Sequence, residues 1–144
     1  MAYCQVWRRG HLKVISSKQR KSLIESHCKI NIWQGAVRSG KTYISLWRFL
    51  EELIEGEDGD YCIISRTYDT FKRNILSPLF DMIGADARHY AGARKMIIFG
   101  KTVWVIGADD ERSEAKLRGS TFKGAYVDEG TLIPESVFQM LISR

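Results

Sequence analysis

The chain has 144 residues, of which 44% are hydrophobic and 27% are charged, and its net charge is +5. This length and composition predict one soluble globular domain, and no apolar run approaches the ~20 residues of a membrane helix, which excludes a membrane protein. The scattered Cys4, Cys28 and Cys62 form no C-x-x-C pair, which argues against a zinc site or a disulfide framework. The positive charge permits a polyanionic partner.

The first half of the chain alternates helical and strand patterns. Residues 17–28 predict a helix, and a short apolar, β-rich run at 30–34 predicts a buried strand. Apolar residues then recur at helical spacing over about 41–55, so that helix is expected to bury one face. An acidic turn separates it from a second buried strand at 61–65.

The second half continues the alternation. Residues 71–83 predict a helix that is bent or broken near Pro78, and 96–106 predict a β-hairpin. A short polar helix at 109–117, a core strand at 125–127 and a terminal helix at 134–143 follow. The expected fold is therefore α/β, with a mainly parallel sheet flanked by helices and a ligand at the carboxyl ends of its strands.

One octapeptide matches the phosphate-binding pattern G-x-x-x-x-G-K-[ST] at every fixed position. Its members are Gly35, Ala36, Val37, Arg38, Ser39, Gly40, Lys41 and Thr42. The two glycines let backbone N–H groups point at phosphate oxygens, Lys41 places a positive charge on the β- and γ-phosphates, and the Thr42 hydroxyl is a ligand for Mg²⁺. The start of the following helix adds its unpaired N–H groups. We expect a nucleoside triphosphate with Mg²⁺.

A second motif supplies the acidic half of such a site. The strand at 125–127 runs directly into Asp128 and Glu129. Asp128 would hold Mg²⁺, as the acid of a Walker B motif does, and Glu129 would act as general base on the attacking water. An N-K-x-D guanine-reading motif is missing from the sequence, which favours ATP over GTP.

Three further residues each allow two interpretations. The Gln19 amide can pair with the edge of adenine, or Gln19 can be an ordinary surface residue of its helix. Arg38 can reach phosphates of its own site or of a neighbouring subunit, or it can face outward. Arg66 ends the second strand, where a structural ion pair is favoured over a contact with phosphate or DNA.

With both motifs in place, the sequence resembles the N-terminal ATPase domain of phage terminase large subunits. The resemblance is carried by the segments 33–42, 64–66 and 117–129, in which an Arg-Gly pair and small polar residues precede the strand that ends in Asp-Glu. It extends from about Gln19 to the last residue, and Gln19 matches the family's adenine-recognition position. Arg38 resembles the loop arginine of the family, which many members carry one position earlier.

The resemblance implies a P-loop ATPase of the ASCE type that couples ATP hydrolysis to translocation of double-stranded DNA. It implies a homo-oligomeric ring with portal protein and small terminase subunit as partners, in the host cytoplasm. The chain then divides into a helical segment at about 1–29 and a nucleotide-binding core at about 30–144. The family's coupling motif and nuclease domain have no counterpart in the sequence. We therefore expect a truncated protein, a split gene product or a prophage remnant, with weak hydrolysis on its own.

Two alternatives stay open. A different DNA-dependent ATPase, such as a helicase or repair translocase, shares these motifs but needs a second RecA-like domain. A catalytically silent fragment that only binds nucleotide or partners would show nucleotide binding without turnover.

Overall fold

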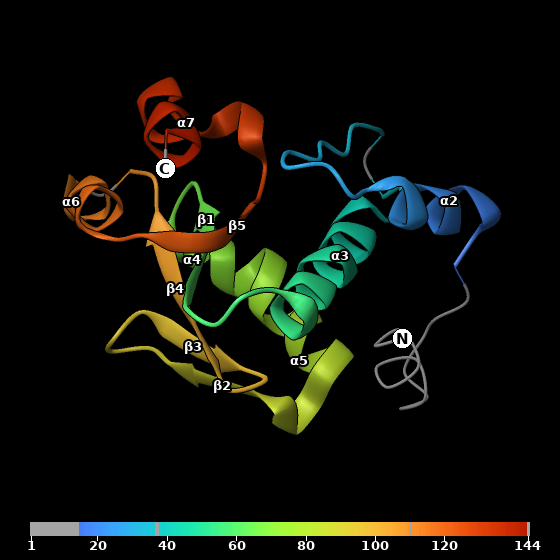
Figure 1. Ribbon diagram of the computed structural model, residues 1–144, viewed down its shortest axis with the longest axis horizontal. Coiled ribbons are helices and arrows are strands. Elements are labelled where there is room, and N and C mark those ends of the chain that lie inside the picture. Colours follow the sequence, from blue (N-terminus) through green and yellow to red (C-terminus); the bar gives the residue numbers. More distant parts are fainter. Residues whose placement is uncertain (1–14, 37, 110, 144) are drawn as a thin grey trace.

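The computed structural model describes residues 15–36, 38–109 and 111–143. These residues form a five-stranded sheet of order β2-β3-β4-β1-β5, covered by helices on both faces (Figure 1). The strands are β1 (Asp60–Ser65), β2 (Ala87–Tyr90), β3 (Lys95–Ile98), β4 (Lys101–Gly107) and β5 (Phe122–Val127). The central strand β1 pairs in parallel with both β4 and β5, and β3 alone runs against the others. The expected α/β fold with a mainly parallel sheet is confirmed.

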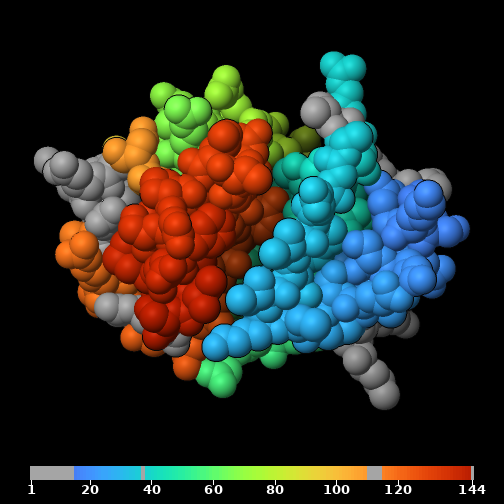
Figure 2. Space-filling view, turned by 90° about the horizontal axis from the view of Figure 1, so that it is seen from above, coloured from blue at the N-terminus to red at the C-terminus, as the bar shows by residue number. Residues whose placement is uncertain are grey.

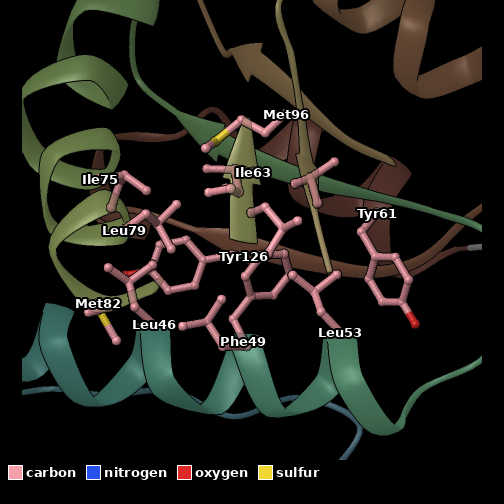
Figure 3. Close-up of a cluster of buried hydrophobic side chains, with 14 of the residues drawn as sticks. Leu46, Phe49, Leu53, Tyr61, Ile63, Ile75, Leu79, Met82, Met96 and Tyr126 are labelled. Carbon is pink, nitrogen blue, oxygen red and sulfur yellow. The ribbon is translucent and has the colours of Figure 1, made fainter. Parts of the chain in front are cut away.

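Two groups of helices sandwich the sheet. On one face lie α3 (Lys41–Glu55), α4 (Tyr68–Phe71) and α5 (Ser77–Ile83), and on the other lie α6 (Glu111–Gly119) and α7 (Glu135–Ile142). Side chains alternate between the two faces along β1, so Tyr61 and Ile63 join the first core while Cys62 and Ile64 join the second. Figure 3 shows α3 presenting Leu46, Phe49 and Leu53 to the first core.

Helix α3 is the most deeply buried helix among the described residues, because it has neighbours on two sides. Its Leu46, Leu50 and Leu53 are fully shielded from solvent. The sheet covers one side, and α2 (Ser17–Glu25) packs against another. The prediction of a helix at 41–55 is confirmed at both ends. Helix α2 begins after its N-cap Ser16 and ends at Glu25, three residues before the predicted end.

The predicted bend near Pro78 takes the form of a π-helical turn, Lys72–Leu76, between α4 and α5. Pro78 has no N–H to donate, and its ring would clash with the carbonyl four residues earlier, which belongs to Asn74. A wider turn at this point accommodates both effects without ending the helix.

The hairpin expected at 96–106 is confirmed as β3 and β4. They are joined by Phe99 and Gly100, which both have positive φ angles, as a two-residue hairpin turn requires. Sequence reasoning missed β2, which pairs antiparallel with β3 at the edge of the sheet. Short 3₁₀ turns lie at Gly84–Asp86 and Gly130–Leu132. None of the described helices is long and apolar enough to cross a membrane.

The predicted strand at 30–34 is wrong. In the described residues this segment pairs with no strand, and Ile30 and Ile32 are 54% and 85% exposed. Trp33 donates its indole N–H to Ser22 Oγ at 2.9 Å, so the segment is held by α2 and not by the sheet. An apolar run forms a strand only beside a hydrogen-bonding neighbour, and this segment has none here.

Candidate functional site

Helix α3 and strand β5 run past each other in a fixed register, and this register decides which residues meet. At one end, a Cβ added to Gly124 would lie 3.7 Å from Glu52 Cγ. Two residues further along β5, the Tyr126 hydroxyl shares a 3.0 Å hydrogen bond with the Ser45 hydroxyl. The Tyr126 ring packs against the Phe49 ring, with centroids 5.7 Å apart.

The next residues in this register are Thr42 and Asp128. Thr42 lies on the same face of α3 as Ser45, one turn closer to the loop, and Asp128 lies on the same face of β5 as Tyr126. The packing of α3 on β5 therefore directs the strand that leads into Asp128 toward the first turn of α3. Ser45 and Tyr126 were missed by sequence reasoning, which regarded their positions only as part of a helix and a strand.

The loop before α3 is folded around its own lysine. Lys41 Nζ donates to the carbonyl oxygens of Gly35 and Ala36 at 2.5 and 2.6 Å, and it lies 3.5 Å from Ser39 Oγ. Gly40 has φ +80°, a conformation that favours glycine, and it precedes α3 without any side-chain cap. The first N–H groups of α3 are consequently left for an anion.

Unlike Gly40, Gly35 has no backbone conformation that favours glycine. Its φ is not positive, and an added Cβ would make only ordinary contacts, at 3.4 Å from Ser39 Oγ and 3.6 Å from Lys41 Cδ. Arg38 is exposed and has φ +63°, an uncommon angle for a residue with a side chain. Val37 lies outside the described residues.

Gln19 lies against the loop. Its Nε2 donates to Ser39 O at 3.3 Å, while its Oε1 accepts from Ser16 N at 2.8 Å in a capping box that begins α2. A Cβ on Gly40 would run into this amide. Both ends of the Gln19 amide are thus engaged in this structure, and pairing with adenine would have to exchange these bonds.

Asp128 is buried, with 6% of its surface exposed. Its backbone N–H donates to Ile64 O at 2.8 Å and so continues the β1–β5 ladder, and its Oδ2 accepts from Asn74 Nδ2 at 3.2 Å. Burial raises the pKa of the Asp128 carboxyl, and the nearby Glu129 charge acts in the same direction, while the Asn74 hydrogen bond opposes them.

Ser65 lies beside Asp128. It ends β1 one position beyond the Ile64–Val127 pair, on the same face of the sheet as Ile63. The Ser65 hydroxyl is buried and has no hydrogen-bond partner in the described part of the chain. An orphaned buried hydroxyl is costly, so its presence beside a buried carboxylate points to a polar ligand that enters this place.

These groups fit Mg²⁺ in a nucleotide complex. A threonine hydroxyl, an aspartate carboxylate and phosphate oxygens are all hard oxygen ligands, as this cation prefers. Among the described residues, no three His, Cys, Asp or Glu side chains gather as a metal site of their own. In a nucleotide complex, phosphate oxygens and waters would supply the other ligands.

The remaining predicted residues lie at the rim. Glu129 is exposed, with φ +49°, and follows Asp128 after the end of β5. Arg66 is exposed at the end of β1. Seen from above, a furrow separates the cyan segment that carries the loop from the red C-terminal part that follows β5 (Figure 2).

Residues 32–144 match the family described as terminase large subunit, T4likevirus-type, N-terminal. The chain belongs to this family. The match covers most of the chain, including the loop at 35–42 and the strand that ends in Asp128. A search of curated proteins gave no significant match.

Solved structures of the large terminase from a thermophilic bacteriophage share the fold. One crystal form is 24% identical over 92% of this chain, with a TM-score of 0.73. The complex of that terminase with ADP is 24% identical over 90%, with a TM-score of 0.71, and its complex with ATP-gamma-S is 20% identical over 90%, with a TM-score of 0.68. This chain spans 36% of the phage protein's length in the first of these comparisons.

Proposed function

We propose that this chain binds ATP with Mg²⁺ and hydrolyses it as the ATPase part of a DNA-packaging motor that moves double-stranded DNA. The observation that carries the proposal is the 3.0 Å hydrogen bond between Ser45 and Tyr126, which joins the helix that begins at Lys41 and Thr42 to the strand that leads into Asp128. The terminase of the thermophilic phage, which has this fold, was solved with ADP and with ATP-gamma-S. Portal protein, small terminase subunit and a ring of subunits are the partners that belong to this role.

Each residue has a defined task in this proposal. The phosphates lie in the loop at 35–42, and Lys41 leaves the two loop carbonyls that it now contacts to meet the β- and γ-phosphates. Thr42 and Asp128 hold Mg²⁺, which offsets the negative charge of the phosphates. Glu129, exposed at the rim, accepts the proton of the attacking water.

Nucleotide binding is tested by calorimetry with ATP and Mg²⁺. Lys41→Ala should lower the affinity by roughly 10- to 100-fold, since a charged hydrogen bond contributes about 1.5–3 kcal/mol. Lys116→Ala is the matched control, because it removes the same charge from α6, on the other face of the sheet. Equal affinities for wild type and Lys41→Ala would refute the assignment.

Turnover is tested separately. Glu129→Gln should keep ATP binding and lose hydrolysis, while Glu135→Gln, an exposed control in the first turn of α7, should change neither. Hydrolysis by the isolated chain is expected to be weak. A wild type that binds ATP but shows no turnover in an assembled complex would favour the silent partner-binding alternative.

Arg38 is the proposed charge-stabilising arginine of the ring. Its exposed position leaves the side chain accessible to a neighbouring subunit or to the γ-phosphate. In an assembled ring, Arg38→Lys should bind ATP nearly normally and lose most hydrolysis, because lysine lacks the two-pronged guanidinium. Wild-type turnover in both Arg38→Lys and Arg38→Ala would exclude this role.

A further inference from the structure

Two polar side chains flank Asp128 on neighbouring elements, and neither belongs to the loop at 35–42 or to the Asp-Glu pair. Asn74 reaches it from the π-helical turn, and Ser65 lies beside it at the end of β1. Asn74 occupies one carboxylate oxygen, Oδ2, and the Ser65 hydroxyl is buried without a partner among the described residues. Asn74 thus makes a hydrogen bond with the Asp128 carboxylate, whereas the hydroxyl of Ser65, on the adjacent strand, is not used.

The position of Asn74 is set by the helix that carries it. Pro78 disfavours a regular α-turn at Asn74, and the resulting π turn changes the direction in which the residues of this turn point. Asn74 is half-buried, while its neighbours Lys72 and Arg73 remain exposed. The wider turn therefore selects this side chain, and no charged one, to meet Asp128.

A neutral amide is suited to this task. It donates to Oδ2 without cancelling the negative charge that a cation needs, whereas an arginine or lysine there would compete with the cation. With Oδ2 engaged, and the Glu129 backbone N–H also bonded to this carboxyl, the carboxylate is fixed in rotation. Its remaining lone pairs are open to another ligand. Hydrogen bonds to a ligating carboxylate commonly raise metal affinity by fixing its orientation.

We propose that Asn74 is a positioning residue that orients Asp128 toward Mg²⁺, and that the buried Ser65 hydroxyl is kept for a water that arrives with the cation. This inference rests on the proposed nucleotide function and adds two residues to its site. Ser65 remains unpaired without the cation, because the buried edge of the sheet offers it no other partner within the described ranges.

The test measures metal binding and stability in the same variants. Mn²⁺ affinity is measured by electron paramagnetic resonance with excess ADP, and ADP affinity without metal is measured by calorimetry. Asn74→Leu, which keeps the shape without the donor, should weaken Mn²⁺ binding by roughly 10- to 100-fold and leave metal-free ADP binding unchanged. Asn74→Ala replaces it if the leucine variant does not fold. Ser77→Ala, a change on the same helix, is the control.

Ser65→Ala gives the sharper result, because stability and metal affinity should move in opposite directions. Removing an unsatisfied buried hydroxyl should raise the melting temperature, while Mn²⁺ affinity falls several-fold. If Ser65 had a purely structural role, the melting temperature and the Mn²⁺ affinity would not change in opposite directions. Unchanged Mn²⁺ affinity in both Asn74→Leu and Ser65→Ala would overturn the inference and leave nucleotide binding intact. A wild type that binds no Mn²⁺–ADP would overturn the proposed function together with it.

Discussion

Asp128 and the loop at 35–42 are the two parts of the candidate site, and the protein holds them by different means. Asp128 continues a strand that is hydrogen-bonded to β1, and its side chain is buried. The loop follows a segment that pairs with no strand in the described residues, and Ile32 in that segment is 85% exposed.

This difference shows that the strands of the sheet position Asp128 but do not position the loop at 35–42. Asp128 is fixed by backbone hydrogen bonds and by the core. The loop is fixed by α3, which follows it, by Gln19, which lies on α2, and by Trp33, which donates a hydrogen bond to α2. Under the proposed function, the loop is the part of the site that a bound nucleotide would rearrange, starting with Lys41.

The largest expected effect contrasts the buried helix with the exposed segment. Leu50→Ala should lower the free energy of unfolding by about 2–5 kcal/mol, because Leu50 is fully buried in α3. Ile32→Ala should change it by less than about 0.5 kcal/mol, since an exposed side chain loses no packing. Urea denaturation measures both. Similar losses in the two variants would show that the segment before the loop is packed in solution.

The second-largest effect is expected at the hydrogen bond between Ser45 of α3 and Tyr126 of β5. Tyr126→Phe should cost about 0.5–1.5 kcal/mol, because the 3.0 Å bond to Ser45 is lost, although Ser45 keeps its bond to Lys41 O. Burial raises the pKa of Tyr126 to about 12, so its hydroxyl stays protonated across the working range. A double-mutant cycle with Ser45→Ala isolates this bond. A coupling energy of zero would mean that this bond does not help to hold α3 against β5.

A smaller difference in stability is expected between alanine substitutions at the two glycines of the loop. Gly40→Ala should destabilise the fold by roughly 1 kcal/mol, because φ +80° is unfavourable for alanine. Gly35→Ala should cost less than about 0.5 kcal/mol, since its added Cβ makes ordinary contacts. Thermal melts without nucleotide compare them. An equal cost at both positions would contradict the described loop conformation.

The smallest effect concerns Glu51 of α3, whose pKa is raised by burial despite its 3.2 Å ion pair with Arg48. A carboxyl with a raised pKa in the folded state favours folding most at low pH, and this contribution is lost as pH rises through the folded pKa. Glu51→Gln should therefore raise the melting temperature slightly at pH 7. Arg48 keeps Glu52 as a partner in that variant.

The control is the same pair of proteins at lower pH. The gain from Glu51→Gln should shrink as pH falls toward about 4, where the wild-type carboxyl also becomes neutral. A gain that grows on acidification would reverse the assigned sign.

Several features were predictable because they depend on residues close in sequence. The helix at 41–55, the hairpin and the strand before Asp128 follow from periodicity and turn residues, and these predictions are confirmed. The interruption of the helix before Pro78 was also expected, because proline acts on its own helix. Its consequence, an asparagine aimed at Asp128, was not visible in the pattern.

The amino-acid sequence by itself determined the G-x-x-x-x-G-K-[ST] octapeptide, the Asp-Glu pair and most of the alternation of helices and strands, since each is a local pattern of residue types. Only the tertiary structure decided that the apolar run at 30–34 stays outside the sheet, and that Asn74 and Ser65 flank Asp128. The reason is physical: a strand exists only beside a partner, and a contact between α3 and β5 depends on the register in which they pack.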